Sequence, residues 1–474
     1  MHDEDTIAAI STPPGEGGIG IVRLSGPEAL SIAKRIFSPP PGARNKEKEN
    51  KINIGAIKTR LMLYGFITDP ETGEQIDEVL IAVMRAPNTY TRQDIVEINC
   101  HGGAQPLART IELALRLGAR LALPGEFTKR AFLNGRIDLT QAEAVLSLIQ
   151  AKSDEAGRAA LAQLKGGLGG RIKEETGKLA RICAHLEASI DFPEEEIEPD
   201  ELAKIMGPLE QLAKRLRTLS DSYEEGKFLK DGIKTAILGK PNVGKSSLLN
   251  ALLSQERAIV TEIPGTTRDV ISEYINLGGY ALKIMDTAGI REARDRPEQE
   301  GVKRSLSALE EADLVLCVLD GSAGIEEQDL WIINRIKAHG KKSILVINKK
   351  DLQWANGFKE TEANTTTDGW PAVSISAKTG DGIAELKQLI VENFRRKGPS
   401  HEAGLLITSL RHKTALDTAF RALGRAIEAI GSGLPAEIIS LELSEALREL
   451  GSITGEVSTD DILAMIFNEF CIGK

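Results

Sequence analysis

The feature that most constrains the fold is the glycine-rich segment 239–246, Gly-Lys-Pro-Asn-Val-Gly-Lys-Ser, which fits G-x-x-x-x-G-K-[ST] at every position. Apolar residues 235–238 before it predict a buried strand, and the apolar spacing of residues 247–253 predicts a helix. In this context backbone N–H groups and the positive end of the helix dipole converge on phosphate oxygens. The alternative, a glycine turn before a packed helix, is disfavoured by these flanks. We predict a nucleoside triphosphate site in which Lys245 reaches the β- and γ-phosphates and Ser246 ligates Mg²⁺.

Three later segments predict which base is bound. Residues 284–289 are an apolar strand ending in D-x-x-G, where Asp286 can hold Mg²⁺ through water. Residues 343–351 end in N-K-x-D, and the carboxylate of Asp351 can accept from N1–H and the exocyclic amine of guanine, which adenine does not offer. Residues 373–378 can supply backbone N–H groups near the guanine O6. Four segments in order, each at a strand end, predict a GTP site at the carboxyl edge of a parallel sheet.

The residues expected to contact the nucleotide belong to these segments and to the loop between the first two. They are Asn242, Val243, Gly244, Lys245, Ser246, Ser247, Thr261, Glu262, Ile263, Pro264, Gly265, Thr266, Thr267, Asp286, Thr287, Ala288, Gly289, Asn348, Lys349, Lys350, Asp351, Ser376, Ala377 and Lys378. Among them, Thr267 is placed to complete the Mg²⁺ shell with Ser246 in the triphosphate state, as a switch segment does.

Length and composition limit the class of protein. A chain of 474 residues is too long for one core, and 41% hydrophobic with 27% charged residues is typical of a soluble globular protein. No apolar run approaches the roughly 18–20 residues of a membrane span, and the acidic first residues are unlike a targeting signal. Four widely spaced cysteines without metal-ligand spacing predict a reducing, cytoplasmic location.

Two further features concern partners. The net charge of −10 means that an RNA partner would need a local basic patch or a helper protein. Cys471 is fourth from the end, as a prenylation signal requires, but Lys474 is a poor last residue and nothing upstream is polybasic. We therefore expect no lipid anchor.

The order of elements predicts a multidomain chain that combines α/β and all-α parts. Strands are expected in 5–25 and at 61–68, 77–84 and 94–99, with helices at 27–36 and 105–117. Helical patterns follow at 140–190, interrupted by the glycines of 166–170, and at 201–228, 409–430, 436–450 and 459–470. We expect an N-terminal α/β domain at 1–135, a helical domain split between 136–232 and 398–474, and an inserted GTPase domain at 233–397.

Several motifs resemble those of known families. Asn-Val-Gly-Lys-Ser at 242–246 and Gly-Thr-Thr-Arg-Asp at 265–269 resemble the TrmE–Era–EngA group of translation-factor-like GTPases. Three outer motifs at 95–103, 124–134 and 471–474, the last reading Cys-Ile-Gly-Lys, resemble the MnmE (TrmE) family of tRNA modification GTPases over essentially the whole chain. The residue after Gly289 is the apolar Ile290, where Ras-like proteins carry a water-orienting glutamine, so another group must hold the attacking water.

The MnmE resemblance implies an N-terminal folate-binding domain that dimerises, a split helical domain, and an inserted P-loop GTPase domain with a Ras-like doubly wound sheet. It implies that K⁺-dependent dimerisation of the GTPase domains triggers hydrolysis. It also implies a homodimer that forms a heterotetramer-type complex with the FAD- and NADH-using partner MnmG (GidA). That complex would add an aminomethyl or carboxymethylaminomethyl group to C5 of the wobble uridine of certain tRNAs. Its one-carbon unit would come from 5-formyl- or 5,10-methylene-tetrahydrofolate.

The same resemblance implies roles for single residues. The K⁺ ligands would be Asn242, Thr261, Ile263 and Thr266, the water-orienting carboxylate would be Glu298, and the folate contacts would be Arg23, Glu97, Arg136 and Lys474. Cationic groups suit the folate glutamate carboxylates, and Glu97 could pair with amine-type donors of the pterin.

Alternative interpretations remain open for Glu298, Glu97 and Cys471, and Arg136 departs from the residue that is usual in the family. Glu298 could be a solvated glutamate with Glu300 in its place, and a carboxylate inside a strand, as at Glu97, usually faces solvent. Arg136 occupies a position where lysine is commoner in the family. Arginine keeps the positive charge of lysine but presents it in a different hydrogen-bonding geometry. Cys471 could be a nucleophile or a buried side chain beside Phe470.

One local departure from the family pattern and two competing functions also bear on the prediction. Thr-Arg-Gln-Asp at 91–94 replaces the family's usual T-G-E-D, which would alter the adjoining turn. A ribosome-assembly switch would need an RNA-binding module with a G-x-x-G loop and a basic face, which the sequence does not contain. A stand-alone folate aminomethyltransferase would not explain the nucleotide site.

Overall fold

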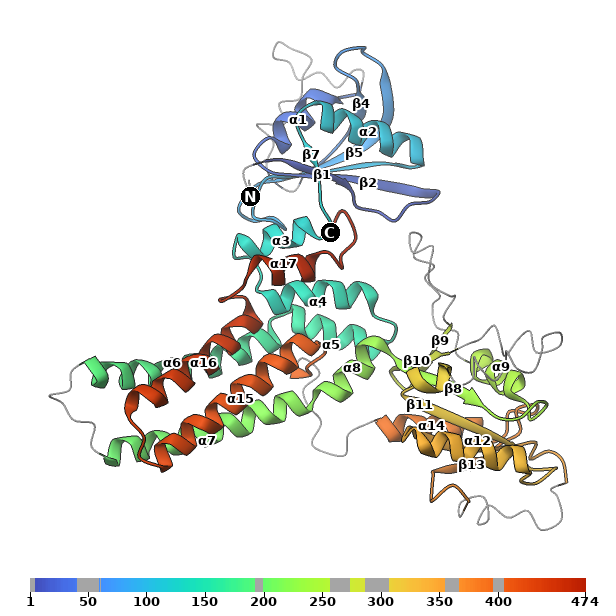
Figure 1. Ribbon diagram of the computed structural model, residues 1–474. Coiled ribbons are helices and arrows are strands. Elements are labelled where there is room, and N and C mark those ends of the chain that lie inside the picture. Colours follow the sequence, from blue (N-terminus) through green and yellow to red (C-terminus); the bar gives the residue numbers. More distant parts are fainter. Residues whose placement is uncertain are drawn as a thin grey trace. The chain divides into compact units, whose positions relative to one another are not determined.

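The computed structural model describes residues 5–40, 59, 61–191, 199–255, 273–285, 307–353, 366–394 and 405–474 (Figure 1). The chain divides into two compact units. The first comprises Met1–Leu146, Glu262–Thr267 and Thr454–Lys474, and the second Ser147–Thr261 and Arg268–Ile453. Each unit is described by itself. In the described part of the chain, no helix combines the length and the apolar character needed to cross a membrane.

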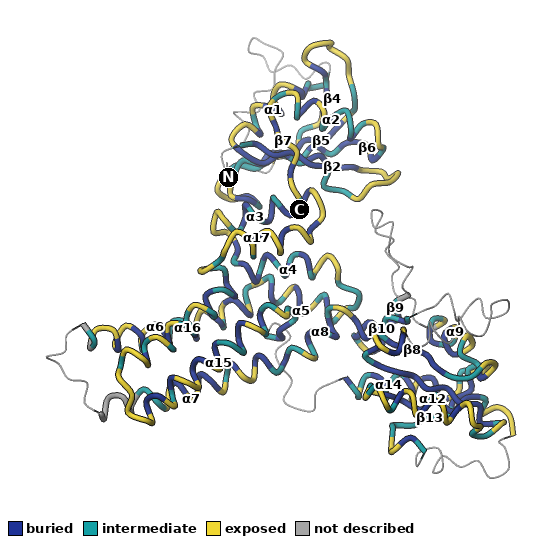
Figure 2. Tube along the Cα trace, in the orientation of Figure 1, coloured by how far each residue is buried: buried dark blue, intermediate teal, exposed yellow. Residues whose placement is uncertain are grey.

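The first unit contains a seven-stranded sheet in the order β3-β4-β5-β6-β2-β1-β7. Its neighbouring strands are antiparallel except for the parallel pair of β1 and β7. The strands are β1 (Ile7–Ile10), β2 (Gly17–Ser25), β3 (Phe37–Ser38), β4 (Leu61–Thr68), β5 (Gln75–Met84), β6 (Ile95–Gly102) and β7 (Arg120–Leu121). Helices α1 (Ala29–Ile36) and α2 (Ala104–Arg116) supply apolar side chains to one core with the sheet (Figures 1 and 2). The expected strands and helices of this region are confirmed.

The C-terminal end of the chain belongs to the same unit. Helices α3 (Glu126–Leu133) and α17 (Asp460–Phe467), together with the first turns of α4 (Leu139–Gln150), share a small apolar core that includes Ala131, Leu139 and Phe467. Beyond α17, Ile472 pairs with Pro124 in an isolated antiparallel bridge. The last residues of the chain are thereby held against the segment before α3.

The helical part of the second unit joins segments from both sides of the insertion. Its helices are α5 (Asp154–Leu164), α6 (Gly167–Asp191), α7 (Pro199–Asp221), α8 (Tyr223–Asp231), α15 (Leu410–Gly431) and α16 (Ala436–Thr454). One core contains Leu186 of α6, Leu216 of α7, Leu423 of α15 and Leu443 of α16. Segments more than 200 residues apart in sequence therefore bury each other's apolar faces.

The helix boundaries differ from the expected ones at three points. The run 140–190 breaks at 151–153, where Ser153 caps α5 by accepting from the amide of Ala156, and again at Gly166, which has φ +93°. Because α6 starts at Gly167, the following glycines form its first turn instead of a break in mid-helix. The expected helix 201–228 divides between α7 and α8 at Ser222, whose hydroxyl donates to the carbonyl of Leu219.

The inserted part of the second unit is a six-stranded sheet in the order β13-β12-β11-β8-β10-β9. All neighbours are parallel except β9. The strands are β8 (Ile233–Leu238), β9 (Glu273–Leu277), β10 (Tyr280–Ile284), β11 (Leu314–Asp320), β12 (Lys342–Asn348) and β13 (Ala372–Ser374). Helices α9 (Lys245–Gln255) and α14 (Ile383–Phe394) pack into one core with the sheet, and α12 (Glu327–Ala338) into another. This confirms a doubly wound α/β fold, in which a ligand binds outside the carboxyl ends of the strands.

Candidate functional site

The phosphate loop connects β8 to α9 at the carboxyl edge of the parallel sheet. Its backbone takes positive φ at Asn242 (+62°) and Gly244 (+98°). A Cβ at position 244 would lie 2.2 Å from Nδ2 of Asn348, so glycine is required there on two grounds. The amide of Asn348 in turn donates to the carbonyl of Val243 at 2.7 Å. The end of β12 therefore fixes the shape of the loop.

Lys245 is folded over this loop. Its Nζ donates to the carbonyl oxygens of Gly239, at 2.7 Å, and Lys240, at 2.8 Å. Burial lowers the pKa of the Lys245 ammonium. The next residue, Ser246, is exposed in the first turn of α9. A cation and a hydroxyl at a helix N-terminus fit a bound phosphate with Mg²⁺.

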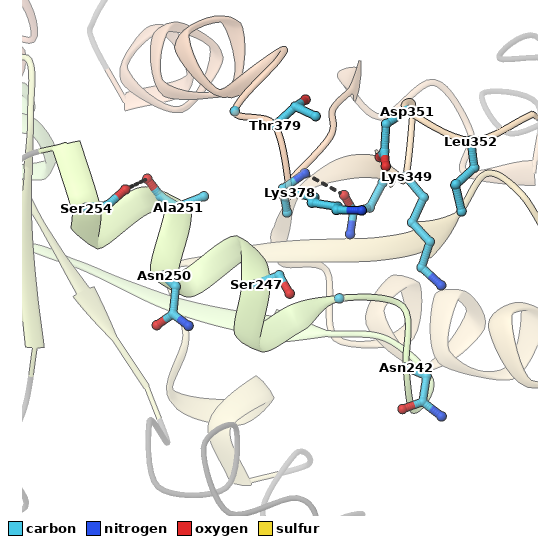
Figure 3. Close-up of a pocket in the computed structure, with 14 residues that line it drawn as sticks. Asn242, Ser247, Asn250, Ala251, Ser254, Lys349, Asp351, Leu352, Lys378 and Thr379 are labelled. Carbon is cyan, nitrogen blue, oxygen red and sulfur yellow. Dashed lines mark hydrogen bonds between the residues drawn. The ribbon is translucent and has the colours of Figure 1, made fainter.

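A cavity of about 770 Å³ opens beside the loop. Ser247, Asn250 and Ser254 of α9 line one side, while the segments after β12 and β13 line the other (Figure 3). The full lining is Asn242, Gly244, Ser247, Asn250, Ala251, Ser254, Asn348, Lys349, Asp351, Leu352, Ala377, Lys378, Thr379 and Gly380. Its size and its polar lining suit a nucleotide.

The carboxylate predicted to read the base is at this cavity. Asp351 accepts a hydrogen bond from the hydroxyl of Ser376 at 2.7 Å, and this bond lowers the pKa of Asp351. Asp351 is therefore ionised at neutral pH, as recognition of N1–H and an amine requires. The amide nitrogen of Ala377 donates to Oδ1 of Asn348 at 2.9 Å, which ties the two base-side segments together.

Some residues at this site were not anticipated from the sequence. Asp320, the last residue of β11, forms an ion pair with Lys349 in which Nζ and Oδ2 are 2.5 Å apart. Lys349 has φ +68°, and Asp320 thus holds a lysine whose backbone is in the left-handed region. Its position at the carboxyl end of a central strand was the available signal. Asn250 and Ser254 could have been found from their helical spacing to Ser247.

Ion pairs between Lys240 and carboxylates of the α12 region also hold the phosphate loop in place. Lys240 Nζ lies 3.0 Å from Oε2 of Glu326 and 3.0 Å from Oδ2 of the buried Asp329, both on or beside α12. These carboxylates raise the pKa of Lys240 against an opposing effect of burial. Lys245 donates to the carbonyl of Lys240, so Lys240 links α12 to Lys245.

Twelve of the 25 predicted nucleotide and catalytic residues fall outside the described residues. These positions are Thr261, Glu262, Ile263, Pro264, Gly265, Thr266, Thr267, Asp286, Thr287, Ala288, Gly289 and Glu298. The roles assigned to them stay predictions.

The first unit gathers a second group of predicted residues around the chain end. Arg23 on β2 and Glu97 on β6 face each other in register, with Nη2 and Nε of Arg23 at 2.7 and 2.8 Å from Oε1 of Glu97. Nη1 of Arg23 also donates to the carbonyl of Gly473 at 3.2 Å. Lys474 is held through its own carbonyl, which accepts from the amide of Phe127 at 3.2 Å. Glu97 is therefore paired inside the unit and does not simply face solvent.

Arg136 is not in direct contact with this group. Its guanidinium lies over the ring of Tyr90, with Cζ 4.6 Å from the ring centroid. Tyr90 itself packs against the apolar cluster of Phe127, and Cζ of Arg23 is 5.6 Å from the centroid of the Phe127 ring. The structure thus brings together three of the four predicted folate contacts and places Arg136 beside a neighbouring aromatic ring.

The structure also bears on two local expectations, the burial of Cys471 and the turn at Arg92. Cys471 is exposed, so the alternative of a buried side chain is wrong, although Phe470 is buried. Arg92, in the turn where the resemblance has glycine, takes φ +60°, and its Nη1 donates to the carbonyl of Asn134 at 2.8 Å. The turn keeps a left-handed residue without glycine, with a hydrogen bond that offsets part of the strain.

A doubly wound sheet with a G-x-x-x-x-G-K-[ST] loop, an N-K-x-D segment and the cavity between them defines the chain as a P-loop GTPase. Comparison with known families gives the finer assignment. The family model described as the MnmE helical domain matches residues 139–471, and that of the GTP-binding protein TrmE N-terminus matches residues 6–136. The chain belongs to the MnmE (TrmE) family.

Relatives of this family match the chain over its full length. The tRNA modification GTPase MnmE of Acetivibrio thermocellus is 44% identical over 474 residues, covering 100% of both chains. That of Thermoanaerobacter pseudethanolicus is 48% identical over 470 residues, covering 99% of each. Among solved structures, Aquifex aeolicus Era bound to GDP·AlF₄⁻ is 28% identical and covers 40% of this chain and 65% of that one. Its TM-score of 0.26 is too low to carry an argument.

Proposed function

We propose that this chain is a K⁺-dependent GTPase that, with the FAD-dependent partner MnmG, modifies C5 of the wobble uridine of certain tRNAs. The added group is aminomethyl or carboxymethylaminomethyl, built with a one-carbon unit from 5-formyl- or 5,10-methylene-tetrahydrofolate. One observation carries this proposal beyond GTP hydrolysis. A chain with a GTP site also gathers Arg23, Glu97 and the terminal Gly473 and Lys474 into one charged cluster of its N-terminal unit.

The nucleotide half of the proposal uses groups with separate tasks. Lys245 neutralises the β- and γ-phosphates, Ser246 and Thr267 hold Mg²⁺, and Asp351 selects guanine. Asn242, Thr261, Ile263 and Thr266 would hold K⁺, which supplies positive charge where other GTPases use an arginine finger. The exposed, left-handed Asn242 leaves its side chain available for such a ligand role. Glu298 orients the attacking water, a task that the apolar Ile290 cannot perform.

The folate half depends on charge complementarity. The Arg23 and Lys474 cations suit the glutamate carboxylates of a folate, and Glu97 suits amine-type donors of the pterin. Arg23 and Glu97 are already paired, so each is oriented before a ligand arrives. Arg136, stacked on Tyr90, would contact the ligand from the side of the aromatic ring.

The proposed assembly follows the family resemblance. We propose a cytoplasmic homodimer formed by the N-terminal domain 1–135. A helical domain of 136–232 and 398–474 carries the GTPase domain 233–397. Closure of two GTPase domains would gate the reaction in a heterotetramer-type complex with MnmG and tRNA.

Calorimetric titration of 5-formyltetrahydrofolate into the full chain tests this function. We expect saturable binding to the wild type and a loss of at least tenfold in affinity for Arg23→Ala, since removing one partner of a charged pair also leaves Glu97 unpaired. Arg109→Ala is the matched control, because Arg109 is a partly exposed arginine of the same unit paired with Glu74. Absence of binding to the wild type would contradict the folate half and leave the GTPase assignment intact.

A further inference from the structure

A long groove runs between α6 and α7 in the helical part of the second unit. Two adjoining cavities, of about 450 and 680 Å³, are lined by side chains of both helices and share Arg215. On α6 the lining residues recur at helical spacing from Gly167 to His185, and on α7 from Ile205 to Leu219. At 1.5 Å per residue, the α6 side of this α6–α7 groove is roughly 27 Å long.

The charge of the groove is opposite to that of the chain. Its charged lining residues are the cations Arg171, Lys178, Arg181, Lys214 and Arg215 and the single acid Glu174. The whole chain carries a net charge of −10. The groove therefore concentrates positive charge on one face of an acidic protein, which favours an anionic ligand.

A buried carboxylate holds three of these cations in place. Glu175, whose side chain is fully buried beneath the groove, lies 3.1 Å from Nη2 of Arg171 and 3.3 Å from Nζ of Lys178. Its second oxygen lies 3.1 Å from Nη2 of Arg215. Glu174 also pairs with Arg171 at 3.0 Å and with Lys178 at 2.6 Å. Two carboxylates therefore face three cations, so the cluster is both ordered and left with an excess of positive charge. Such preorganisation lowers the entropic cost of binding.

The two remaining cations are available to a ligand. Arg181 and Lys214 are exposed, and neither forms an ion pair with any residue of the described part of the chain. They lie on different helices, and Arg181 lines one cavity while Lys214 lines the other. The groove thus presents charge along its length, as a ligand with many regularly spaced negative groups requires.

We propose that the α6–α7 groove binds the phosphate backbone of tRNA. This inference rests on the proposed function, which makes tRNA a partner, and it names the surface that an acidic chain would use. Phosphate contacts by lysine and arginine give affinity and orientation without reading sequence, so one groove can serve several tRNAs. No side chain of the nucleotide site takes part in this groove.

Binding of an unmodified tRNA transcript to the full chain, followed by fluorescence anisotropy over a range of KCl concentrations, tests the inference. The double variant Arg181→Ala/Lys214→Ala removes the two unpaired cations and leaves the Glu175 cluster intact. We expect the slope of log affinity against log salt to fall by about 2, or one per phosphate contact, and the affinity at ~0.1 M salt to fall about tenfold or more. The conservative pair Arg181→Lys/Lys214→Arg should restore most of the slope.

The matched control is Arg421→Ala/Arg448→Ala, which removes two exposed arginines of α15 and α16 that line neither cavity. Its salt slope should equal that of the wild type, and unchanged GTP turnover would show that both variants fold. An unchanged slope in the Arg181/Lys214 variant would overturn the inference. The inference would also fail if the Arg181/Lys214 variant kept its tRNA affinity but no longer bound the partner flavoprotein, because the groove would then be a protein interface. If the wild type itself binds no tRNA, the proposed partner fails as well.

Discussion

The nucleotide site and the charged cluster at the chain end are built in different ways. The nucleotide site takes its groups from short segments that each follow a strand of one parallel sheet, so 239–246 and 376–378 meet at one edge. The cluster takes Arg23 and Glu97 from two antiparallel strands and Gly473 from the other end of the sequence. A parallel sheet collects its strand ends at one edge by topology alone, whereas the cluster depends on docking of the C-terminal tail.

The two sites also differ in how their charges are held. In the nucleotide site, the ammonium of Lys245 donates to two backbone carbonyl groups, and Asp351 accepts from a hydroxyl. In the cluster, Arg23 and Glu97 neutralise each other. The charges of Lys245 and Asp351 are thus not paired with each other, while a ligand at the cluster must share the charges of Arg23 and Glu97, which are already paired. We therefore expect substitutions in the nucleotide site to have the larger effects.

The largest effects are expected from Lys245→Ala and Glu298→Ala, which should differ in whether GTP binding is also lost. Loss of the Lys245 ammonium removes charge from both the bound and the reacting phosphates, so GTP affinity falls and turnover falls about 10²–10³-fold. Glu298→Ala should abolish hydrolysis and spare GTP binding, because the carboxylate acts on water. Single-turnover hydrolysis and binding of a fluorescent GTP analogue separate the two results. Near-normal turnover of the Glu298 variant would remove that residue from the site.

Asp351→Asn should have the next largest effect. An amide cannot accept from both N1–H and the exocyclic amine, so GTP affinity should fall roughly 10- to 100-fold. The affinity for xanthosine triphosphate (XTP) should rise. Competition binding with GTP, XTP and ATP measures the change in selectivity. Asp381→Asn offers a control, since Asp381 is an exposed aspartate that pairs with Lys350. Unchanged preference for GTP in the Asp351 variant would refute the base-reading role.

The smallest expected effect is a difference in thiol reactivity, and labelling compares Cys317 of the GTPase sheet with Cys471 at the chain end. Burial raises the pKa of Cys100 and of Cys183 to about 11, and that of Cys317 in the GTPase sheet to about 12. A pKa near 11 lowers the thiolate fraction at neutral pH by roughly a hundredfold, whereas Cys471 at the chain end is exposed. Iodoacetamide followed by mass spectrometry should therefore modify Cys471 first.

The same labelling can be repeated with folate present. If the cluster binds 5-formyltetrahydrofolate, the ligand should slow modification of Cys471 and leave GTP turnover unchanged. Labelling of Cys317 at a rate comparable to that of Cys471 would contradict the burial of the GTPase sheet. A Cys471 rate that saturating folate does not change would argue against a ligand near the tail.

The sequence by itself determined the nucleotide site and its class. The phosphate loop, the N-K-x-D segment and the apolar strands before them are local patterns, and the rules of parallel sheets convert their order into a common edge. The roles predicted for Asp351 and Lys245 therefore rest on their local motifs. The sequence also predicts that the GTPase domain is inserted within a helical region, because helical patterns without intervening strands lie between about 140 and 230 and after about 400.

Only the tertiary structure decided features that depend on residues distant in sequence. At the break between α7 and α8, the hydroxyl of Ser222 accepts from the distant amide of Ile407. The pairing of Lys349 with Asp320 and the stacking of Arg136 on Tyr90 likewise join residues far apart in sequence. The α6–α7 groove is the clearest case, since each helix alone carries mixed charges. Its excess of cations arises because packing brings one face of α6 against one face of α7 and buries Glu175 beneath them. A sequence records which residues a helix carries, and packing decides which of them share a surface.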